Sequence, residues 1–268
     1  MDKTIKAILK TVIPSEFLPT LRAAMEKVVY FGFRYKCPLC NSRLRCFLPF
    51  GLKLSVFREK KVVGGGYRQN ALCPICGSLD RERLLYLYLL KKTDLFEKPK
   101  KLLHVAPEPR VANILRTKVK VDYLTADISS KNVMVKMDIT DICFPDHSFD
   151  AIICNHVLEH IIDDGKAISE FYRTLKPGGW AILQVPLSLT LKNTYEDFSI
   201  ATIRGREEAF GQEDHVRIYA ADYNDRLAHA GFKVTVFRWV TETATFGGRQ
   251  NIFGLNEKEC VYLVSKIR

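Results

Sequence analysis

The chain has 268 residues, of which 47% are hydrophobic and 26% are charged, enough for one large core or a main domain with an appendage. This composition excludes a disordered or fibrous protein. The longest uncharged apolar stretch, Trp180 to Leu191, contains Gln184 and Pro186 and is too short to span a bilayer. The first residues lack the apolar core and cleavage site of a secretory signal, so the sequence predicts a cytoplasmic protein with reduced thiols.

The positive charge is concentrated in the first hundred residues. Residues 1–100 contain 20 Lys and Arg against 8 Asp and Glu, whereas residues 101–268 contain 21 against 22. This imbalance indicates two regions and suggests that the first meets an anionic partner. RNA, DNA, an acidic or phosphorylated glycan and an anionic membrane surface all fit such a charge. A basic surface that is only solvated remains an alternative of equal weight.

Residues 1–33 are expected to form a helical segment. Apolar residues recur at helical spacing in Ile5–Val12 and in Phe17–Val29, and Pro14 separates the two. After the cysteine-rich part of the chain, Ser78 is placed to cap a further helix from about Leu79 to Lys92. This helix belongs to a connecting segment at residues 81–100, which leads into the second region.

Two Cys-x-x-Cys pairs lie between these helical segments, Cys37 with Cys40 and Cys73 with Cys76. Each pair forms a tight turn that directs two sulfurs to one point, and two such turns supply the four thiolates of a structural Zn²⁺ site. A redox motif would need a single pair in a βαβ context, and disulfides conflict with the predicted compartment. We therefore expect a zinc ribbon at residues 34–80, in which Cys46 is a spare thiol. Its expected pieces are strands at Leu44–Phe50 and Lys53–Phe57 and a turn at Gly64–Gly66.

From residue 101 onward, short apolar runs alternate with helical patterns, which indicates βαβ units around a parallel sheet. The predicted fold class is α/β, a seven-stranded doubly wound, Rossmann-like sheet preceded by a small helical and zinc-ribbon module. A ligand is expected beyond the carboxyl ends of the strands. The predicted strands are Lys101–Ala106, Val121–Thr125, Val133–Met137, Phe149–Cys154, Trp180–Pro186, Lys233–Val240 and Cys260–Lys266. The predicted helices are Val111–Arg116, Asp164–Leu175 and Ala221–His229.

Two runs in this region, Asp138–His160 and Tyr172–Pro186, resemble class I S-adenosyl-L-methionine (SAM) dependent methyltransferases of type 11. A bacterial group of these enzymes is similar from about residue 35 onward. It has a four-cysteine ribbon before the domain and an Asp-His-Val-Arg motif after it, here Asp214 to Arg217. The resemblance implies a class I methyltransferase domain at residues 101–268 with SAM as the methyl donor. It says little about the acceptor.

The same resemblance implies which residues meet SAM. The loop after the first strand takes the place of the family's glycine-rich SAM loop, but its glycines are missing, as they are in the ribbon-bearing group. Glu108 in this loop could accept a hydrogen bond from the cofactor's ammonium group, and a domain that has lost SAM is the alternative. The implied cofactor residues are His104, Ala106 and Glu108 in the loop, Asp127 for the ribose, Asp138 and Ile139 for the adenine, and Asn155 beside the sulfonium.

Methyl transfer from a sulfonium mainly requires alignment, and a general base is needed only where the acceptor loses a proton. The candidate catalytic residues are His156, Glu159, His160 and His215. Some of them could instead bind a divalent metal, as in the similar metal sites of small-RNA and ubiquinone-pathway O-methyltransferases. We favour His215 as the base, with activity falling near pH 6.5 as it protonates, because it follows residues 188–213, which are expected to form a lid.

These features predict a SAM-dependent methyltransferase that acts on an anionic or glycan-like small-molecule acceptor. The alternatives are an RNA methyltransferase, and a non-catalytic nucleic-acid-binding protein that joins a zinc ribbon to an inactive methyltransferase-like domain. Nucleic acid is not favoured, because the ribbon is expected to lack the exposed, interleaved aromatic residues of a stacking platform. The sequence leaves the acceptor atom, the pathway and the oligomeric state open.

Overall fold

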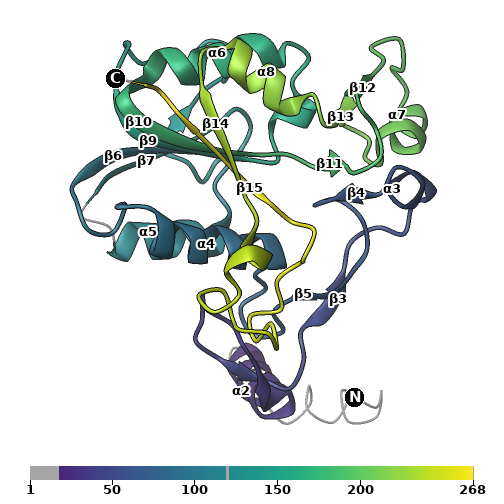
Figure 1. The fold of residues 1–268 in the computed structure, drawn as a ribbon. Helices are drawn as coiled ribbons and strands as arrows, with labels where there is room; N and C mark the ends of the chain where they lie inside the picture. The colour runs from purple at the N-terminus through teal and green to yellow at the C-terminus, as the bar shows by residue number, and fades with distance from the viewer. Residues whose placement is uncertain (1–17, 119–120, 268) are drawn as a thin grey trace.

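Seven strands form one mixed sheet in the order β14-β15-β10-β9-β6-β7-β8 (Figure 1). The computed structural model describes residues 18–118 and 121–267. The five strands from β10 to β8 in this order pair in parallel, whereas β15 is antiparallel to both of its neighbours. This arrangement confirms the predicted α/β class and its seven strands. They are β6 Lys100–Val105, β7 Val121–Asp127, β8 Val135–Lys136, β9 Phe149–Asn155, β10 Leu175–Gln184, β14 Lys233–Phe237 and β15 Val261–Ser265.

Helices cover both faces of this sheet (Figure 1). Along β9, Ala151 and Ile153 belong to one buried apolar cluster and Ile152 to the other, because successive side chains of a strand point to opposite faces. One cluster contains leucines of α4, and the other contains apolar residues of α6 and α8. The helices are α4 Asp80–Lys92, α5 Pro109–Lys118, α6 Asp164–Thr174 and α8 Tyr223–His229, with short 3₁₀ turns η1 Leu158–His160 and η2 Trp239–Glu242.

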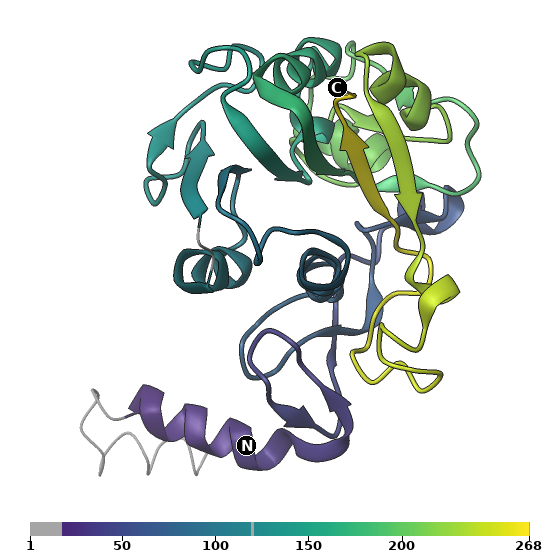
Figure 2. The same cartoon turned by 60° about the vertical axis from the view of Figure 1, so that its left-hand side comes forward.

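The chain before the sheet forms a small module of short strands with α2, Leu18–Tyr30, at one end of the molecule (Figures 1 and 2). Two antiparallel pairs build the module, β1 Phe31–Lys36 with β2 Arg43–Leu44, and β3 Leu48–Phe50 with β5 Arg68–Leu72. α2 covers the helix predicted at Phe17–Val29, whereas the helix predicted at Ile5–Val12 lies outside the described residues. No helix in the described parts of the chain is long and apolar enough to cross a membrane.

The strand predicted at Lys53–Phe57 is wrong, because α3, Ser55–Glu59, is a helix. Val56 and Phe57 are adjacent in sequence and both are buried, which a half-exposed strand does not allow. One turn of helix places both against Phe210 and Ile218 of the sheet domain. The strand pattern was therefore produced by residues that pack against a distant part of the chain.

The predicted cap at Ser78 is also wrong. α4 begins at Asp80, its N-cap residue is Leu79, and no side chain caps it. The Ser78 hydroxyl instead lies 3.1 Å from the Cys76 sulfur, so its side chain serves the cysteine cluster. The acidic residues Asp80 and Glu82 occupy the first turn, where the helix dipole favours negative charge.

The module and the sheet domain are joined by backbone pairing and by a buried arginine. β4, Val62–Val63, pairs with β11, Leu187–Ser188, just after the sheet strand β10. Arg83 of α4 is fully buried, and its guanidinium donates hydrogen bonds to five carbonyl oxygens. Two of these belong to the C-terminal region and three to the module, so Arg83 fastens the two together. The five carbonyls are those of Asn70, Ala71, Ser78, Phe253 and Gly254.

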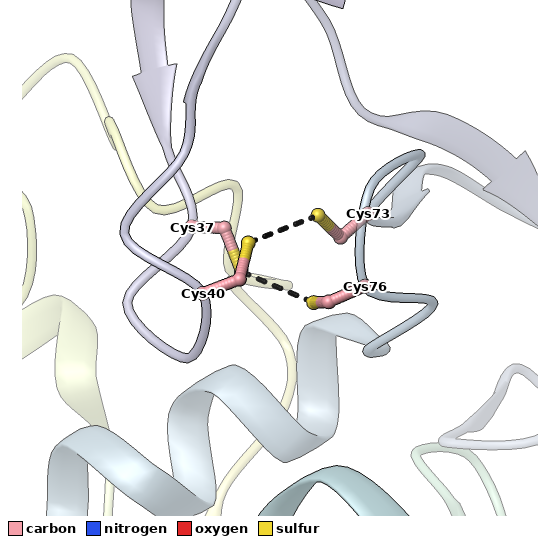
Figure 3. Close-up of side chains that lie close together, drawn as sticks. All are labelled: Cys37, Cys40, Cys73 and Cys76. Carbon is pink, nitrogen blue, oxygen red and sulfur yellow. Dashed lines mark hydrogen bonds between the residues drawn. The ribbon is translucent and has the colours of Figure 1, made fainter. Parts of the chain in front are cut away.

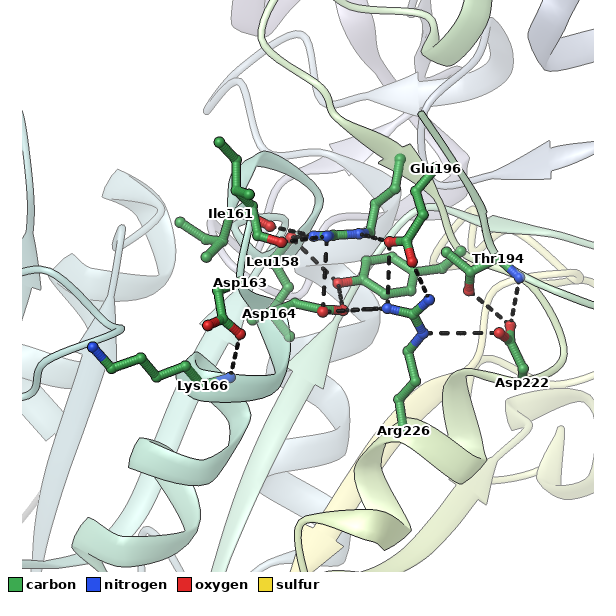
Figure 4. A network of polar contacts seen from close by, with 12 residues as sticks. Leu158, Ile161, Asp163, Asp164, Lys166, Thr194, Glu196, Asp222 and Arg226 are labelled. Atoms are coloured by element: carbon green, nitrogen blue, oxygen red, sulfur yellow. Dashed lines mark hydrogen bonds and ion pairs between the residues drawn. The ribbon is translucent and has the colours of Figure 1, made fainter. Parts of the chain in front are cut away.

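The segment expected to form a lid, residues 188–213, contains β12 Tyr195–Glu196 and α7 Ile203–Phe210. β12 pairs with β13, Arg217–Ile218, and the Glu196 carboxylate accepts from Arg217 and Arg226. Figure 4 shows Glu196 within a network that also includes Asp164 and Asp222. This part of the segment is therefore held to the sheet domain by buried and half-buried ion pairs.

Candidate cofactor and catalytic site

The four cysteines of the two pairs converge on one point (Figure 3). Cys37 and Cys40 come from the turn after β1, and Cys73 and Cys76 come from the turn between β5 and α4. The sulfurs of Cys37 and Cys76 are 3.7 Å apart, and those of Cys40 and Cys73 are 3.9 Å apart. Four sulfurs placed about 2.3 Å from a central Zn²⁺ would lie about 3.8 Å from one another. The cluster is compatible with tetrahedral zinc, and it leaves out Cys46.

Hydrogen bonds among the four sulfurs shift their pKa values in opposite directions. Bonds from Cys37 and Cys73 lower the pKa of Cys76 to about 6, and bonds from Cys37, Cys73 and Cys76 lower the pKa of Cys40, whereas bonds within the same cluster raise the pKa values of Cys37 and Cys73. The guanidinium of Arg83 is buried beside the same cysteines. A cation in this place compensates part of the charge of a zinc ion held by four thiolates.

A hydrogen-bonded chain holds the loop that follows β6. The two ring nitrogens of His104 lie 2.9 Å from the Tyr123 hydroxyl and 2.9 Å from the Glu108 carboxylate. The Asn155 amide donates to the other carboxylate oxygen of Glu108 at 3.0 Å. Burial raises the pKa of Glu108, but the bonds from His104 and Asn155 outweigh it and the net shift is downward. Three predicted cofactor residues are thus bound to one another, and they fix the loop without glycines.

Ala106 and Asp127 face each other across the ends of β6 and β7. Ala106 has a φ of +44°, a left-handed conformation that glycine adopts more easily, so the loop keeps a glycine-like backbone. Asp127 uses one carboxylate oxygen to accept from Ser129 and Ser130. Both residues line a pocket of about 290 Å³. Partial burial raises the pKa of Asp127, but the hydrogen bonds from Ser129 and Ser130 outweigh it, so the net shift is downward.

These observations fit a bound SAM molecule. The second oxygen of Asp127 accepts from no described residue, and Asp127 lines the pocket, which agrees with its expected contact with ribose hydroxyls. The buried Oδ1 of Asn155 has no partner within the described chain, but Asn155, Glu108 and His104 are not among the residues that line this pocket. Asp138 is exposed and bonds to Thr140, and Ile139 is buried in the core, so neither lines this pocket. Their proposed contact with adenine remains a prediction.

The four candidate catalytic residues lie together at the carboxyl edge of β9. His156 follows the strand with a φ of +55°, and its Nδ1 is 3.3 Å from a Glu159 carboxylate oxygen. Ligand atoms of Glu159, His160 and His215 all lie within 4.8 Å of one another. Strained backbone such as that of His156 is concentrated at functional sites. The structure thus brings together residues that are 59 positions apart in the sequence.

Arg217, the last residue of the Asp-His-Val-Arg motif, positions this group. It is fully buried and donates to the carbonyls of Leu158 and Ile162, on either side of Glu159 and His160. The backbone amide of Val216 donates to the Glu159 carbonyl. The motif therefore fixes η1, the turn that carries two of the candidate catalytic side chains.

Burial sets the proton affinities of these side chains. It raises the pKa of Glu159 to about 8, and the second carboxylate oxygen of Glu159 is buried with no hydrogen-bond partner among the described residues. Burial and the neighbouring His160 lower the pKa of His215 to about 4. Burial, with Arg81 and Arg68 nearby, lowers the pKa of His156 well below its usual value. His156 and His215 are therefore neutral at pH 7, whereas Glu159 titrates near it.

The N-terminal module also reaches this edge. Gly64, which follows β4, has a φ of +90°, and a Cβ on it would lie 3.0 Å from the His156 ring. Arg81 of α4 donates to the Gly64 carbonyl, and its Nε is buried without a described partner. Glu259 lies beside Gly64, and burial raises its pKa to about 7. The sequence analysis missed these three residues, because only the contact between the two regions brings them to the site.

A larger pocket, of about 910 Å³, lies between the module and the C-terminal region. Val63, Gly66 and Arg68 form one wall, on the segment whose Gly64 touches His156. The charge of Arg68 is neutralised there by a bidentate ion pair with Asp80. The remaining charges make the pocket basic, since one acidic residue, Glu257, stands against four cations. These cations are Lys53, Arg58, Lys61 and Lys258.

Residues 92–183 match the model of a family described as a methyltransferase domain. This match confirms the class of domain predicted for this part of the chain. A protein of Mycolicibacterium smegmatis described as a probable S-adenosylmethionine-dependent methyltransferase is 25% identical over 130 residues, 46% of each chain. A demethylmenaquinone methyltransferase of Bacteroides fragilis is 31% identical over 105 residues, 39% of this chain and 40% of the relative. The chain thus spans less than half the length of these curated relatives.

Solved methyltransferase structures are also similar. The 1,6-didemethyltoxoflavin-N1-methyltransferase of Burkholderia thailandensis covers 70% of this chain and 78% of its own, with 14% identity and a TM-score of 0.47. The phosphoethanolamine N-methyltransferase 2 of Haemonchus contortus covers 72% of this chain and 53% of its own, with 16% identity and a TM-score of 0.47.

Proposed function

We propose that the protein is a SAM-dependent methyltransferase that acts on an anionic or glycan-like small molecule and carries a structural Zn²⁺ in its N-terminal module. The observation that carries the proposal is the gathering of predicted cofactor and catalytic residues at one edge of the sheet, where β6, β7 and β9 end. This edge lies within or beside the part of the chain that matches a methyltransferase domain.

In this proposal the chain binds and orients both reactants. The second carboxylate oxygen of Asp127 accepts from the ribose hydroxyls, and the backbone at Ala106 lies against the cofactor. Glu108 and Asn155 present a carboxylate and a free amide oxygen to its ammonium end. Bound SAM supplies an electrophilic methyl group. Because the reaction is a displacement, alignment of the two reactants contributes most of the rate.

We propose Glu159 as the group that removes a proton from a hydroxyl or amine acceptor. The best general base has a pKa near the working pH, which Glu159 meets at about 8. His215, preferred from the sequence, is a weaker base because its pKa is about 4. His215 and His156 then serve to hold the carboxylate and the acceptor. Binding of a divalent metal by Glu159, His160 and His215 is the alternative role of this group.

The basic pocket supports an anionic acceptor. Its four cations are exposed and form no ion pair with a described residue, and its wall includes the segment that touches His156. We expect inorganic pyrophosphate to bind the wild type and to bind a Lys53→Ala/Lys61→Ala variant about 30-fold more weakly, since each of the two lost contacts to a charged group costs about 1 kcal/mol. Calorimetry measures this difference, with Lys166→Ala/Lys233→Ala as the control. If the Lys53→Ala/Lys61→Ala variant binds pyrophosphate as tightly as the control variant, this pocket does not bind the acceptor.

Replacing Asp127 with alanine is expected to weaken SAM and S-adenosylhomocysteine binding about 10- to 100-fold, through the loss of two hydrogen bonds to a charged group. Asp127→Asn is a sharper variant. Its amide oxygen can still accept from Ser129 and Ser130, so the loop is kept while the carboxylate is lost. Asp122→Asn, on the same strand and exposed, makes the same change of charge away from the pocket. Unchanged affinity in both Asp127 variants would contradict the assigned ribose contact.

A further inference from the structure

α2 packs against almost nothing in the described chain. None of its described side chains is buried, and three apolar ones on one face are exposed, Met25, Val28 and Val29. β1 follows α2 directly and begins with two further exposed apolar residues, Phe31 and Phe33, which are 55% and 76% exposed. We call these five residues the apolar tip. Phe31 and Phe33 lie just before residues 34–80, the range expected to lack exposed, interleaved aromatic residues, and within that range Phe50 and Tyr67 are exposed.

The residues of the apolar tip are close to one another along the chain, and its two aromatic rings are in contact. The rings of Phe31 and Phe33 are 5.2 Å apart in an edge-to-face arrangement. The Arg43 guanidinium lies 5.7 Å from the centre of the Phe33 ring. β1 follows α2 without a break, so Val28 and Val29 lie three and two residues before Phe31. A monomeric protein rarely exposes such a group of apolar side chains unless a partner covers it.

Basic side chains surround the apolar tip. Of the acidic residues in this part of the described chain, Glu26 lies closest along the helix, and it is already paired with Arg22. The basic residues near the tip are exposed and have no ion pair with a described residue. They are Lys27, Arg34, Lys36, Arg43 and Arg45. A partner complementary to this surface therefore has both apolar and anionic groups.

Three kinds of partner can be compared on this basis. A second copy of the chain would bring two such basic surfaces together, which costs free energy. A single-stranded nucleic acid would stack its bases on flat rings, but three of the five tip residues are not aromatic and the two rings meet edge to face. A lipid bilayer with anionic headgroups accepts both features, since apolar side chains enter the boundary of the acyl chains while basic ones stay at the headgroups.

We propose that the apolar tip docks the protein on an anionic membrane surface. α2 then lies in the interfacial plane, with Val28, Val29, Phe31 and Phe33 inserted and Arg34, Arg43 and Arg45 at the lipid phosphates. The helix has 13 residues, a length that is marginal in water, and lipid contact stabilises it. This inference does not depend on methyl transfer, because it concerns a surface at the opposite end of the module from the sheet.

The test is co-sedimentation of the full, zinc-loaded chain with two kinds of vesicle. One is phosphatidylcholine alone, and the other is equal parts of phosphatidylcholine and phosphatidylglycerol. We expect binding to the anionic vesicles only, weakening as salt is raised. Arg43→Ala/Arg45→Ala should bind about 10- to 30-fold more weakly, following the usual contribution of a basic residue near a charged bilayer. Phe31→Ser/Phe33→Ser should lose binding to a similar extent.

Lys166→Ala/Lys233→Ala is the matched control, because it removes two exposed lysines from the sheet domain and should bind like the wild type. Zinc content and S-adenosylhomocysteine affinity report whether each variant is folded. Wild-type binding by both tip variants would overturn the proposal, since residues 1–17 or another surface would then be responsible. Retention on polyuridylate with no retention on anionic vesicles would overturn it in favour of nucleic acid. If the wild type binds anionic vesicles but transfers no methyl group, the proposed function is wrong and the membrane proposal stands.

Discussion

Replacing Cys73 with serine is expected to release Zn²⁺ from the protein and to loosen the N-terminal module. Three thiolates bind zinc far more weakly than four, and the free energy of metal binding is part of the folding free energy of such a module. Metal analysis of the purified protein measures the first effect, and limited proteolysis within residues 34–80 measures the second. The sheet domain has its own two apolar clusters and should keep its secondary structure.

Cys46→Ser is the matched control for this experiment, because Cys46 lies in the same module but outside the cluster. It should keep zinc and protease resistance. A wild-type protein purified without zinc, with every thiol open to alkylation, would contradict the proposed metal site. Retention of zinc by Cys73→Ser together with its loss from Cys46→Ser would show that Cys46 is the ligand instead.

Glu159→Gln is expected to lower turnover by about 10²- to 10⁴-fold, the usual contribution of a general base, while SAM affinity is kept. Glutamine has the same size and leaves the backbone bond from Val216 in place. His215→Ala should have a smaller effect on turnover. Separate measurement of kcat and of S-adenosylhomocysteine affinity distinguishes these outcomes. Full activity in Glu159→Gln would remove this carboxyl from the mechanism.

The pH profile follows from the same pKa shifts. Only the ionised form of Glu159 accepts a proton, so turnover should rise with pH and reach half of its maximum at about pH 8. The fall near pH 6.5 expected from the sequence is not retained, because burial lowers the pKa of His215 to about 4 and keeps it neutral there. A profile with a midpoint near 6.5 that disappears in His215→Ala would restore His215 as the base.

A divalent metal at the same group gives a different result. If Glu159, His160 and His215 bind it, a chelator should abolish turnover without removing the zinc of the cysteine cluster, and added Mg²⁺ or another divalent ion should restore activity. If Glu159 acts as the base, turnover should be insensitive to the chelator. His160→Ala helps to separate the two roles, because loss of a ligand should raise the metal concentration that activity requires.

Features that depend on local sequence were predicted well. The sequence pattern of residues 101–268 located all seven strands, and the buried parallel ones are recognisable as short apolar runs between turn residues. β8 is shorter than predicted, with two residues in place of Val133–Met137, since an edge strand pairs on one side only. The spacing of the cysteines predicted their cluster, because each pair is a single turn.

Features that depend on contact between the two regions were not predictable. Lys53–Phe57 has an apolar pattern that suits a strand, yet Phe57 is buried against α7 and the segment is helical. Gly64, Arg81 and Glu259 come from three distant parts of the chain and meet beside His156. The sequence pattern of a single segment does not predict this contact. The left-handed backbone conformation of Ala106 was also not predictable, because alanine has no preference for it.

SAM binding where β6, β7 and β9 end is the property on which the proposed function depends. Calorimetric titration of the zinc-loaded protein with SAM and with S-adenosylhomocysteine measures it. We expect saturable binding of both at a single site per chain, weakened in Asp127→Ala and Asp127→Asn and unchanged in Asp122→Asn. No binding by an intact, zinc-loaded protein would rule out this function.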